Sequence, residues 1–214
     1  MPRIGIVGSG PKQLLPDLKQ YEEKIDFWIG VDRGAIEILR EKLPLHYAIG
    51  DFDSVDDMER GYIQDKAREF DQHPAEKNET DLELGLEKAM SLKPKEIYLF
   101  GVTGGRLDHE LINIQQLLAI KQKNIDGFIV DTKNLIQIAI PGNHIISKDD
   151  KYPYISFIPF SEKVENITLN GFYYPLSEET IHYGSTLCLS NELVSNNGTF
   201  FFENGILLVI KSRD

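Results

Sequence analysis

The sequence has little cysteine, no long apolar run and no recognisable leader. Its single cysteine, Cys188, cannot form an internal disulfide, which fits a reducing compartment. No apolar run approaches the ~20 residues that cross a bilayer, which argues against an integral membrane protein. The first ten residues lack a basic segment followed by a long apolar stretch, which argues against secretion. These absences predict a cytoplasmic protein.

Basic residues are also scarce. The chain of 214 residues has 23 Lys and Arg against 34 Asp and Glu, a formal net charge of −11. Such a chain repels nucleic acid and anionic membranes, since phosphate contacts require Lys and Arg gathered on one face. We therefore expect neither as a partner. Most of the acids need no role beyond solubility, so the informative question is whether some of them cluster.

Several familiar catalytic motifs are absent. There is no Walker A pattern, no Cys/His cluster for zinc and no Gly-x-Ser-x-Gly nucleophile elbow. Gly8-Ser9-Gly10 follows an apolar run, but Gln13 occupies the place of the third glycine of a dinucleotide fingerprint. By themselves Gly8 and Gly10 are as consistent with a plain turn as with a nucleotide loop.

The first two thirds of the chain alternate short apolar runs with amphipathic segments. The expected strands are residues 4–7, 27–31, 46–49, 96–100 and 127–131, and the expected helices are residues 35–42, 56–70, 81–92 and 107–121. This alternation is typical of an α/β domain with a parallel sheet flanked by helices.

The last third is strand-like. The expected strands are residues 154–160, 164–169, 186–189, 199–202 and 206–210. Asn204-Gly205 between two apolar runs indicates a type I′ hairpin turn. We expect an α/β domain over residues 1–140 and a small antiparallel β domain over residues 141–214.

Acidic residues follow the expected strands of the α/β domain. In an open parallel sheet, ligands bind beyond the carboxyl ends of the strands. Acids gathered at that edge repel one another, so a cation is the natural compensation. The acids in such positions are Asp32, Asp51, Asp53 and Asp108, with Asp81 at the start of a helix.

Among these acids, Asp51 and Asp53 are the pair that most clearly indicates a metal site. If the strand continues through them, they face the same side about 7 Å apart and can share one Mg²⁺ or hold two ions. The alternative is a loop in which Asp53 or Ser54 caps the next helix. Capping also accounts for Thr80-Asp81, since Thr80 is a good N-cap and Asp81 suits the first turn.

The segment from Gly101 to His109 is richer in polar chemistry. Glycines after a strand allow close backbone approach to a phosphate, and Arg106 adds a fork of donors suited to phosphate oxygens. A phosphate-binding loop does not need a carboxylate, so Asp108 indicates a further role, either binding metal or accepting a proton. We assign His109 a supporting role.

Together these segments resemble the signature blocks of the thiamine pyrophosphokinase family. The blocks are Gly50-Asp51-Phe52-Asp53-Ser54, Lys77-Asn78-Glu79-Thr80-Asp81, Gly104-Gly105-Arg106-Leu107-Asp108-His109 and Ser190-Asn191-Glu192. Gly30-Val31-Asp32-Arg33-Gly34-Ala35 is similar to bacterial members. One departure is Asn78, where the family usually carries Asp.

The resemblance implies an α/β nucleotide-binding domain followed by a β-sandwich domain, in a homodimer with the active site at the subunit interface. It implies transfer of diphosphate from ATP to the hydroxyl of thiamine, with Mg²⁺. Asp51, Asp53, Asp81 and Asp108 would form the catalytic, metal-binding centre, Arg106 would contact phosphate, and Ser190 and Asn191 would lie near thiamine. The residues expected to bind ATP are Gly8, Gly10, Asp32, Lys77, Thr80, Gly104, Gly105, Arg106 and His109.

Two other readings of the acidic cluster stay open. One is a metal-dependent nucleotide phosphohydrolase, in which water replaces the alcohol. The other is a nucleotide-sensing module whose β domain binds a partner. Asp81 and Asp108 are the candidates for the carboxylate that takes the proton from the thiamine hydroxyl.

Overall fold

The chain forms two compact units, Met1–Thr132 and Lys133–Asp214. The computed structural model describes residues 1–74, 76 and 78–214. Lys77, expected to bind ATP, lies outside the described residues. Strand β7 (Asn134–Ala139) pairs with β13 (Leu207–Ser212) and falls in the second unit, whereas the sequence analysis expected the first domain to reach residue 140.

The first unit is built on a parallel sheet. Its order is β4-β3-β2-β1-β5-β6, and every pair is parallel. Because β1 lies between β2 and β5, the chain winds outward from it in both directions. That switch point is where α/β sheets bind ligands. The strands are β1 (Arg3–Val7), β2 (Phe27–Val31), β3 (Tyr47–Gly50), β4 (Glu69–Gln72), β5 (Glu96–Phe100) and β6 (Asp126–Val130).

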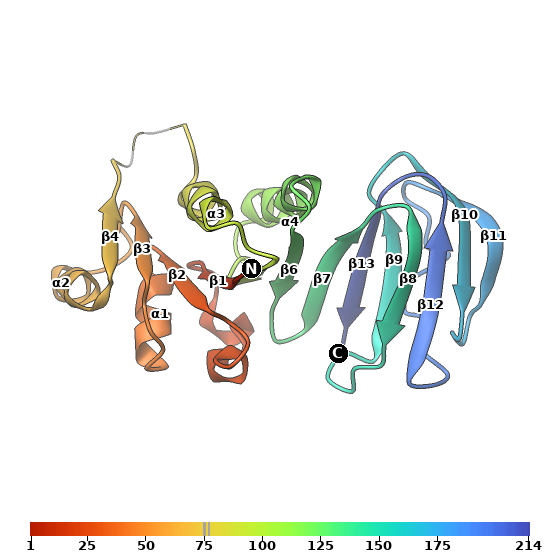
Figure 1. Ribbon diagram of the computed structural model, residues 1–214, viewed down its shortest axis with the longest axis horizontal. Coiled ribbons are helices and arrows are strands. Elements are labelled where there is room, and N and C mark those ends of the chain that lie inside the picture. The colour runs from red at the N-terminus through yellow and green to blue at the C-terminus, as the bar shows by residue number, and fades with distance from the viewer. Residues whose placement is uncertain (75, 77) are drawn as a thin grey trace. The chain divides into compact units, whose positions relative to one another are not determined.

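Helices cover both faces of this sheet. Helices α1 (Gly34–Arg40) and α2 (Asp57–Lys66) lie on one face, and α3 (Asp81–Ser91) and α4 (Leu107–Gln122) lie on the other (Figure 1). Two short 3₁₀ helices, Lys12–Leu14 and Leu18–Tyr21, follow β1. The expected α/β class is confirmed. No helix among the described residues is long and apolar enough to cross a membrane.

The expectation of one helix over residues 56–70 is wrong, because strand β4 begins at Glu69. Helix α2 ends at Lys66, and Ala67 is already extended. The strand pairs with β3 at the edge of the unit, and three of its four residues are exposed. A short, polar strand of this kind lacks the apolar alternation that identifies strands in sequence.

A buried histidine joins β2 to the segment before β3. The backbone N–H of Trp28 donates to Nδ1 of His46 at 3.1 Å, so the ring must be neutral there. Burial, helped by the charge of Arg68 and opposed by a hydrogen bond with the Pro44 backbone, lowers the pKa of His46 below its ordinary 6.5. The unfolded chain therefore binds this proton more readily than the folded one.

We expect His46 to destabilise the fold as the pH falls below about 6.5, the ordinary pKa of histidine, because the unfolded chain then gains its proton first. A His46→Asn variant keeps an acceptor on the side chain but does not titrate, so its Tm is expected to fall less between pH 7 and pH 5. Thermal melts of both proteins across this range check the difference. Parallel Tm curves would contradict the assignment.

The second unit is a β-sandwich. One antiparallel sheet has the order β7-β13-β9 and the other β11-β10-β12-β8. Phe157 and Leu207 from the first sheet and Leu169, Phe200 and Phe202 from the second belong to one buried core. The remaining strands are β8 (Gly142–Ser147), β9 (Tyr154–Pro159), β10 (Lys163–Asn170), β11 (Leu176–His182) and β12 (Asn197–Phe202).

Two local expectations in this unit are wrong. Residues 186–189 form no strand: the Leu189 N–H turns back to the Thr186 carbonyl at 3.3 Å, and Leu187 and Leu189 are exposed. Asn204-Gly205 connects β12 to β13, which belong to different sheets, so it is not a hairpin. Only Gly205 of the two has a positive φ, +101°, whereas a type I′ turn needs two.

Candidate active site

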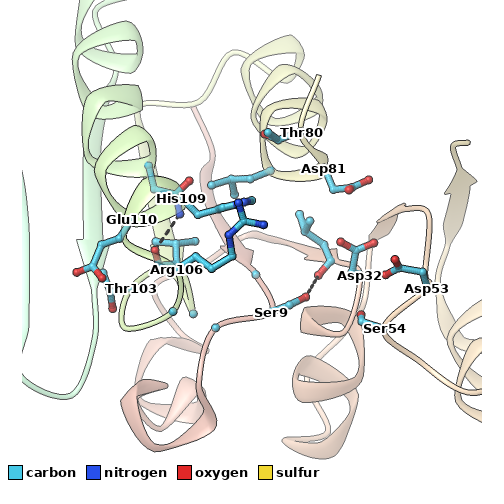
Figure 2. Close-up of a pocket in the computed structure, with 18 of the residues that line it drawn as sticks. Ser9, Asp32, Asp53, Ser54, Thr80, Asp81, Thr103, Arg106, His109 and Glu110 are labelled. Atoms are coloured by element: carbon cyan, nitrogen blue, oxygen red, sulfur yellow. Dashed lines mark hydrogen bonds between the residues drawn. The ribbon is translucent and has the colours of Figure 1, made fainter. Parts of the chain in front are cut away.

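A pocket of about 520 Å³ lies at the carboxyl ends of the strands in the first unit. Segments that follow β1, β2, β3 and β5 line it, together with the first turns of α3 and α4. Asp32, Asp53 and Asp81 gather on one side, and Arg106, His109 and Glu110 lie on the other (Figure 2). The pocket is thus acidic on one side and has a cationic guanidinium on the opposite side.

Three carboxylates come together at this edge of the sheet, and two of them, Asp32 and Asp81, line the pocket. Asp32, Asp51 and Asp81 each offer one oxygen, and these oxygens lie within 4.8 Å of one another. Asp32 directly follows β2, with a φ of +48°, and its Oδ1 accepts a hydrogen bond from the Phe52 N–H at 3.2 Å. Asp81 is the first residue of α3, whose N-cap Thr80 accepts a hydrogen bond from the Glu83 N–H at 3.2 Å.

Gly50 makes this grouping possible. It ends β3 with a φ of +150°, a conformation that disfavours side chains. A Cβ added there would lie 1.9 Å from Oδ1 of Asp32. The absence of a side chain therefore admits the Asp32 carboxylate into the space next to Asp51.

The three carboxylates create a local excess of negative charge. Burial, followed by the charges of Asp81, Asp51 and Asp53, raises the pKa of Asp32 to about 7. The charged form of Asp32 is thus disfavoured when no cation is bound. A hard divalent cation with oxygen ligands would relieve this repulsion, so the donor set fits Mg²⁺.

Asp53 does not occupy the position expected from an extended strand. Strand β3 ends at Gly50, Phe52 has a φ of +59°, and the Asp53 N–H donates to Oδ1 of Asp51 at 3.0 Å. The chain turns here because a left-handed residue stands between the two acids. Asp53 still lines the pocket, exposed. The cap of α2 is Asp56, not Asp53 or Ser54.

The glycines after β1 and β5 allow two loops to pack together. The Gly10 N–H donates to the Gly101 carbonyl at 2.7 Å, and a Cβ on Gly10 would lie 2.6 Å from that oxygen. Gly101 and Gly104 have φ values of +63° and +77°. Gly8, Gly10, Gly101 and Gly105 line the pocket, whereas Gly104 is exposed and is not one of the lining residues.

Arg106 and Asp108 form a two-pronged ion pair at the start of α4. Nε and Nη2 of Arg106 donate to the two Asp108 oxygens at 3.2 and 2.6 Å. This pairing lowers the pKa of Asp108. Arg106 and His109 line the pocket, and Asp108 pairs with Arg106 rather than joining the group of Asp32, Asp51 and Asp81.

Several polar residues that line the pocket were not among the expected site residues. Asn113 on α4 donates from Nδ2 to the Val102 carbonyl at 2.8 Å, and Glu110, one turn earlier, accepts from the Gly104 N–H at 3.0 Å. Their spacing of three residues on one helix face was the available signal. The others are Ser9, Ser54, Glu79 and Thr103.

Ser190 and Asn191 lie in the second unit. Asn191 is 2% exposed, and its side-chain oxygen accepts from the N–H groups of Tyr174 and Glu192 at 3.0 and 2.9 Å. Its Nδ2 donates to the Tyr174 carbonyl at 2.8 Å. This amide therefore fixes the backbone at Tyr174, while Ser190 is exposed with a φ of +52°.

The chain is similar to known proteins over its full length. Residues 18–129 match the family model "Thiamin pyrophosphokinase, catalytic domain", and residues 143–207 match "Thiamin pyrophosphokinase, vitamin B1 binding domain". A thiamine pyrophosphokinase of Bacillus subtilis is 47% identical over 214 residues, 100% of both chains.

Solved structures agree with these matches. The crystal structure of thiamine pyrophosphokinase from Bacillus subtilis has a TM-score of 0.93 at 45% identity and covers 99% of each chain. That of thiamin pyrophosphokinase from Geobacillus thermodenitrificans has a TM-score of 0.89 at 44% identity, with 99% of this chain and 98% of that chain covered. The resemblance found in the sequence is confirmed, and the chain belongs to the thiamin pyrophosphokinase family.

Proposed function

We propose that the chain transfers the terminal diphosphate of ATP to the hydroxyl of thiamine, giving thiamine diphosphate and AMP, and that the reaction requires Mg²⁺. The observation that carries the proposal is a pocket in which Asp32 and Asp81, grouped with Asp51, lie across from a glycine-rich loop and Arg106, in a member of this family. Attack on phosphorus demands positioning and charge neutralisation more than covalent help, and the pocket offers residues for both.

Asp32, Asp51 and Asp81 would hold the metal. Bound there, Mg²⁺ would neutralise charge that develops on the phosphate oxygens. Asp53 and Asp108 stay proposed as further members of the metal-binding centre, on the resemblance. Asp53 supports this by lining the pocket close enough to raise the pKa of Asp32.

The phosphates of ATP would lie against the glycines and the start of α4. Backbone N–H groups at a helix N-terminus and the Arg106 fork suit phosphate oxygens. Asp108 accepts hydrogen bonds from Nε and Nη2 of Arg106, so the N–H groups that point away from Asp108 would contact phosphate. The residues proposed to bind ATP remain Gly8, Gly10, Asp32, Lys77, Thr80, Gly104, Gly105, Arg106 and His109.

One carboxylate must accept the proton of the thiamine hydroxyl. Asp81 and Asp108 are the candidates from the sequence. Pairing with Arg106 lowers the pKa of Asp108, which weakens it as a base. Asp81 is also proposed as a metal ligand, so both Asp81 and Asp108 stay proposed for this step.

Thiamine recognition is proposed for residues 141–214, and ATP binding and catalysis for residues 1–140. Ser190 offers an exposed hydroxyl, and the buried Asn191 would act by holding the backbone at Tyr174. We also propose a cytoplasmic homodimer with the active site at the subunit interface. Exposed Tyr173, Tyr174 and Leu187 in the second unit suit a surface covered by another chain.

The test is incubation with ATP and Mg²⁺, with and without thiamine, followed by chromatography of the nucleotides. AMP that forms only with thiamine is the expected result. Release of AMP or ADP without thiamine would indicate a phosphohydrolase instead. ATP binding without turnover in either mixture would indicate a nucleotide-sensing module.

A further inference from the structure

A buried side-chain pair anchors the glycine-rich loop, which we define as residues 101–106. The Thr103 hydroxyl donates to Oδ2 of Asp131 at 2.8 Å, and the two residues are 5% and 2% exposed. Asp131 follows β6, the strand next to β5, whereas the loop follows β5 itself. The contact thus ties the loop to the neighbouring strand, behind the pocket wall.

The loop needs such an anchor because of its composition. Gly101 and Gly104 adopt positive φ values and flank Val102 and Thr103. Glycine has the largest backbone freedom to lose on ordering, so a stretch with three glycines is held in one shape only by contacts with its surroundings. Within the loop, Thr103 is the side chain that hydrogen-bonds to a buried carboxylate.

A buried carboxylate is costly unless hydrogen bonds compensate it, and hydrogen bonds to charged groups are stronger than those between neutral groups. Contacts at Val102 and Gly104 come from Asn113 and Glu110 on α4. Thr103 provides the link on the opposite side of the loop, to the sheet. The pocket wall formed by residues 101–106 is therefore fixed between a helix and a strand.

We propose that Thr103 and Asp131 are positioning residues, whose hydrogen bond holds the glycine-rich loop in the shape that binds the phosphates of ATP. The proposal rests on the proposed function, because it takes this loop as the ATP-binding wall. Neither residue touches the reacting atoms in this account. Their loss lowers the population of the competent loop, which weakens the apparent affinity for ATP.

The test compares Thr103→Val, which removes the hydroxyl at constant shape, with Thr103→Ser, which keeps it. Thr103→Val and Asp131→Ala, which remove the donor and the acceptor of this bond, are expected to raise the KM for ATP about tenfold or more, the loss expected for a hydrogen bond to a charged group. The KM for thiamine and the kcat at saturating ATP are expected to change less than threefold. Thr103→Ser should restore the KM for ATP to within about threefold of the original.

Hydrogen–deuterium exchange supplies a readout that does not depend on turnover. Amides of residues 101–106 are expected to exchange faster in Thr103→Val, without ligand, than in the original protein or in Thr103→Ser. The double variant Thr103→Val/Asp131→Ala should lose little more than Asp131→Ala alone, because each change removes the same bond. Thr168→Val, which removes a hydroxyl bonded to the Glu178 N–H in the second unit, is the control and should leave the KM for ATP unchanged.

Unchanged exchange and an unchanged KM for ATP in Thr103→Val would overturn the proposal. Equal losses for ATP and thiamine, or a lower Tm with the KM for ATP unchanged, would also overturn it, since both indicate a general structural role. If Thr103→Val does not fold, Asp131→Ala and Thr103→Ser provide the same comparison. If the original protein does not use thiamine, the proposed function fails, whereas exchange and calorimetry with Mg·ATP still decide this inference.

Discussion

Asp51→Asn is expected to lower the Mg²⁺-dependent rate of thiamine diphosphate formation by about 10²–10³-fold, the usual cost of losing one electrostatic contact to the transition state. Asparagine keeps the shape of the side chain and an oxygen that can still accept the Asp53 N–H. It removes one of the three negative charges whose oxygens lie within 4.8 Å of one another. The fold is therefore preserved while the affinity for the cation falls.

The measurement is a rate profile against Mg²⁺ concentration, with a thermal melt of the same protein. Asp57→Asn is the matched control, because Asp57 is an exposed aspartate of the first unit that pairs with Arg60 away from the pocket. Its rate is expected to stay within about twofold, as is usual for exposed ion pairs. A rate for Asp51→Asn near that of the original protein at saturating Mg²⁺ would refute the metal assignment.

Gly50→Ala is expected to damage both stability and catalysis. The new Cβ would lie 1.9 Å from Oδ1 of Asp32, and a φ of +150° disfavours any side chain. Backbone strain of this kind costs about 1–3 kcal/mol. Because the Asp32 carboxylate must also move, the Mg²⁺-dependent rate is expected to fall at least tenfold, beyond what the lower Tm explains.

Gly61→Ala separates this effect from glycine replacement in general. Gly61 lies inside α2, and a Cβ added there meets nothing within 4 Å. Alanine in a helix interior is favoured over glycine by about 0.5–1 kcal/mol, so this variant should melt at the same or a higher temperature, with full activity. Equal activity of the two variants would show that Asp32 does not need the space beside Gly50.

The sequence predicts the architecture well where patterns are regular. The apolar strands and amphipathic helices of the first unit come from buried, periodic segments, and helices α3 and α4 begin at Asp81 and Leu107, as predicted. Strand β4 was not predicted, because an exposed edge strand has no apolar alternation in its sequence. The hairpin predicted at Asn204-Gly205 is wrong because the turn preference of two residues does not reveal which sheet the next strand joins.

The sequence predicts which edge of the sheet carries the acidic residues, but not which of their carboxylates lie close together. Acids at strand ends were expected to lie together, and Asp32, Asp51 and Asp81 do. That Asp32 offers one of the three grouped oxygens, while Asp108 pairs with Arg106, depends on left-handed turns and rotamers that no spacing encodes. Asn191 shows the same limit: its amide looks available for a ligand in the sequence, yet its oxygen and Nδ2 are bonded to the backbone.

The central claim is that the chain moves a diphosphate from ATP to thiamine in one step. The most direct measurement is ³¹P NMR of a mixture of the protein, ATP, thiamine and Mg²⁺, followed over time. Thiamine diphosphate and AMP are expected to appear in equal amounts, and neither is expected when thiamine or Mg²⁺ is left out. Formation of ADP with thiamine monophosphate, or of AMP with inorganic diphosphate in the absence of thiamine, would contradict it.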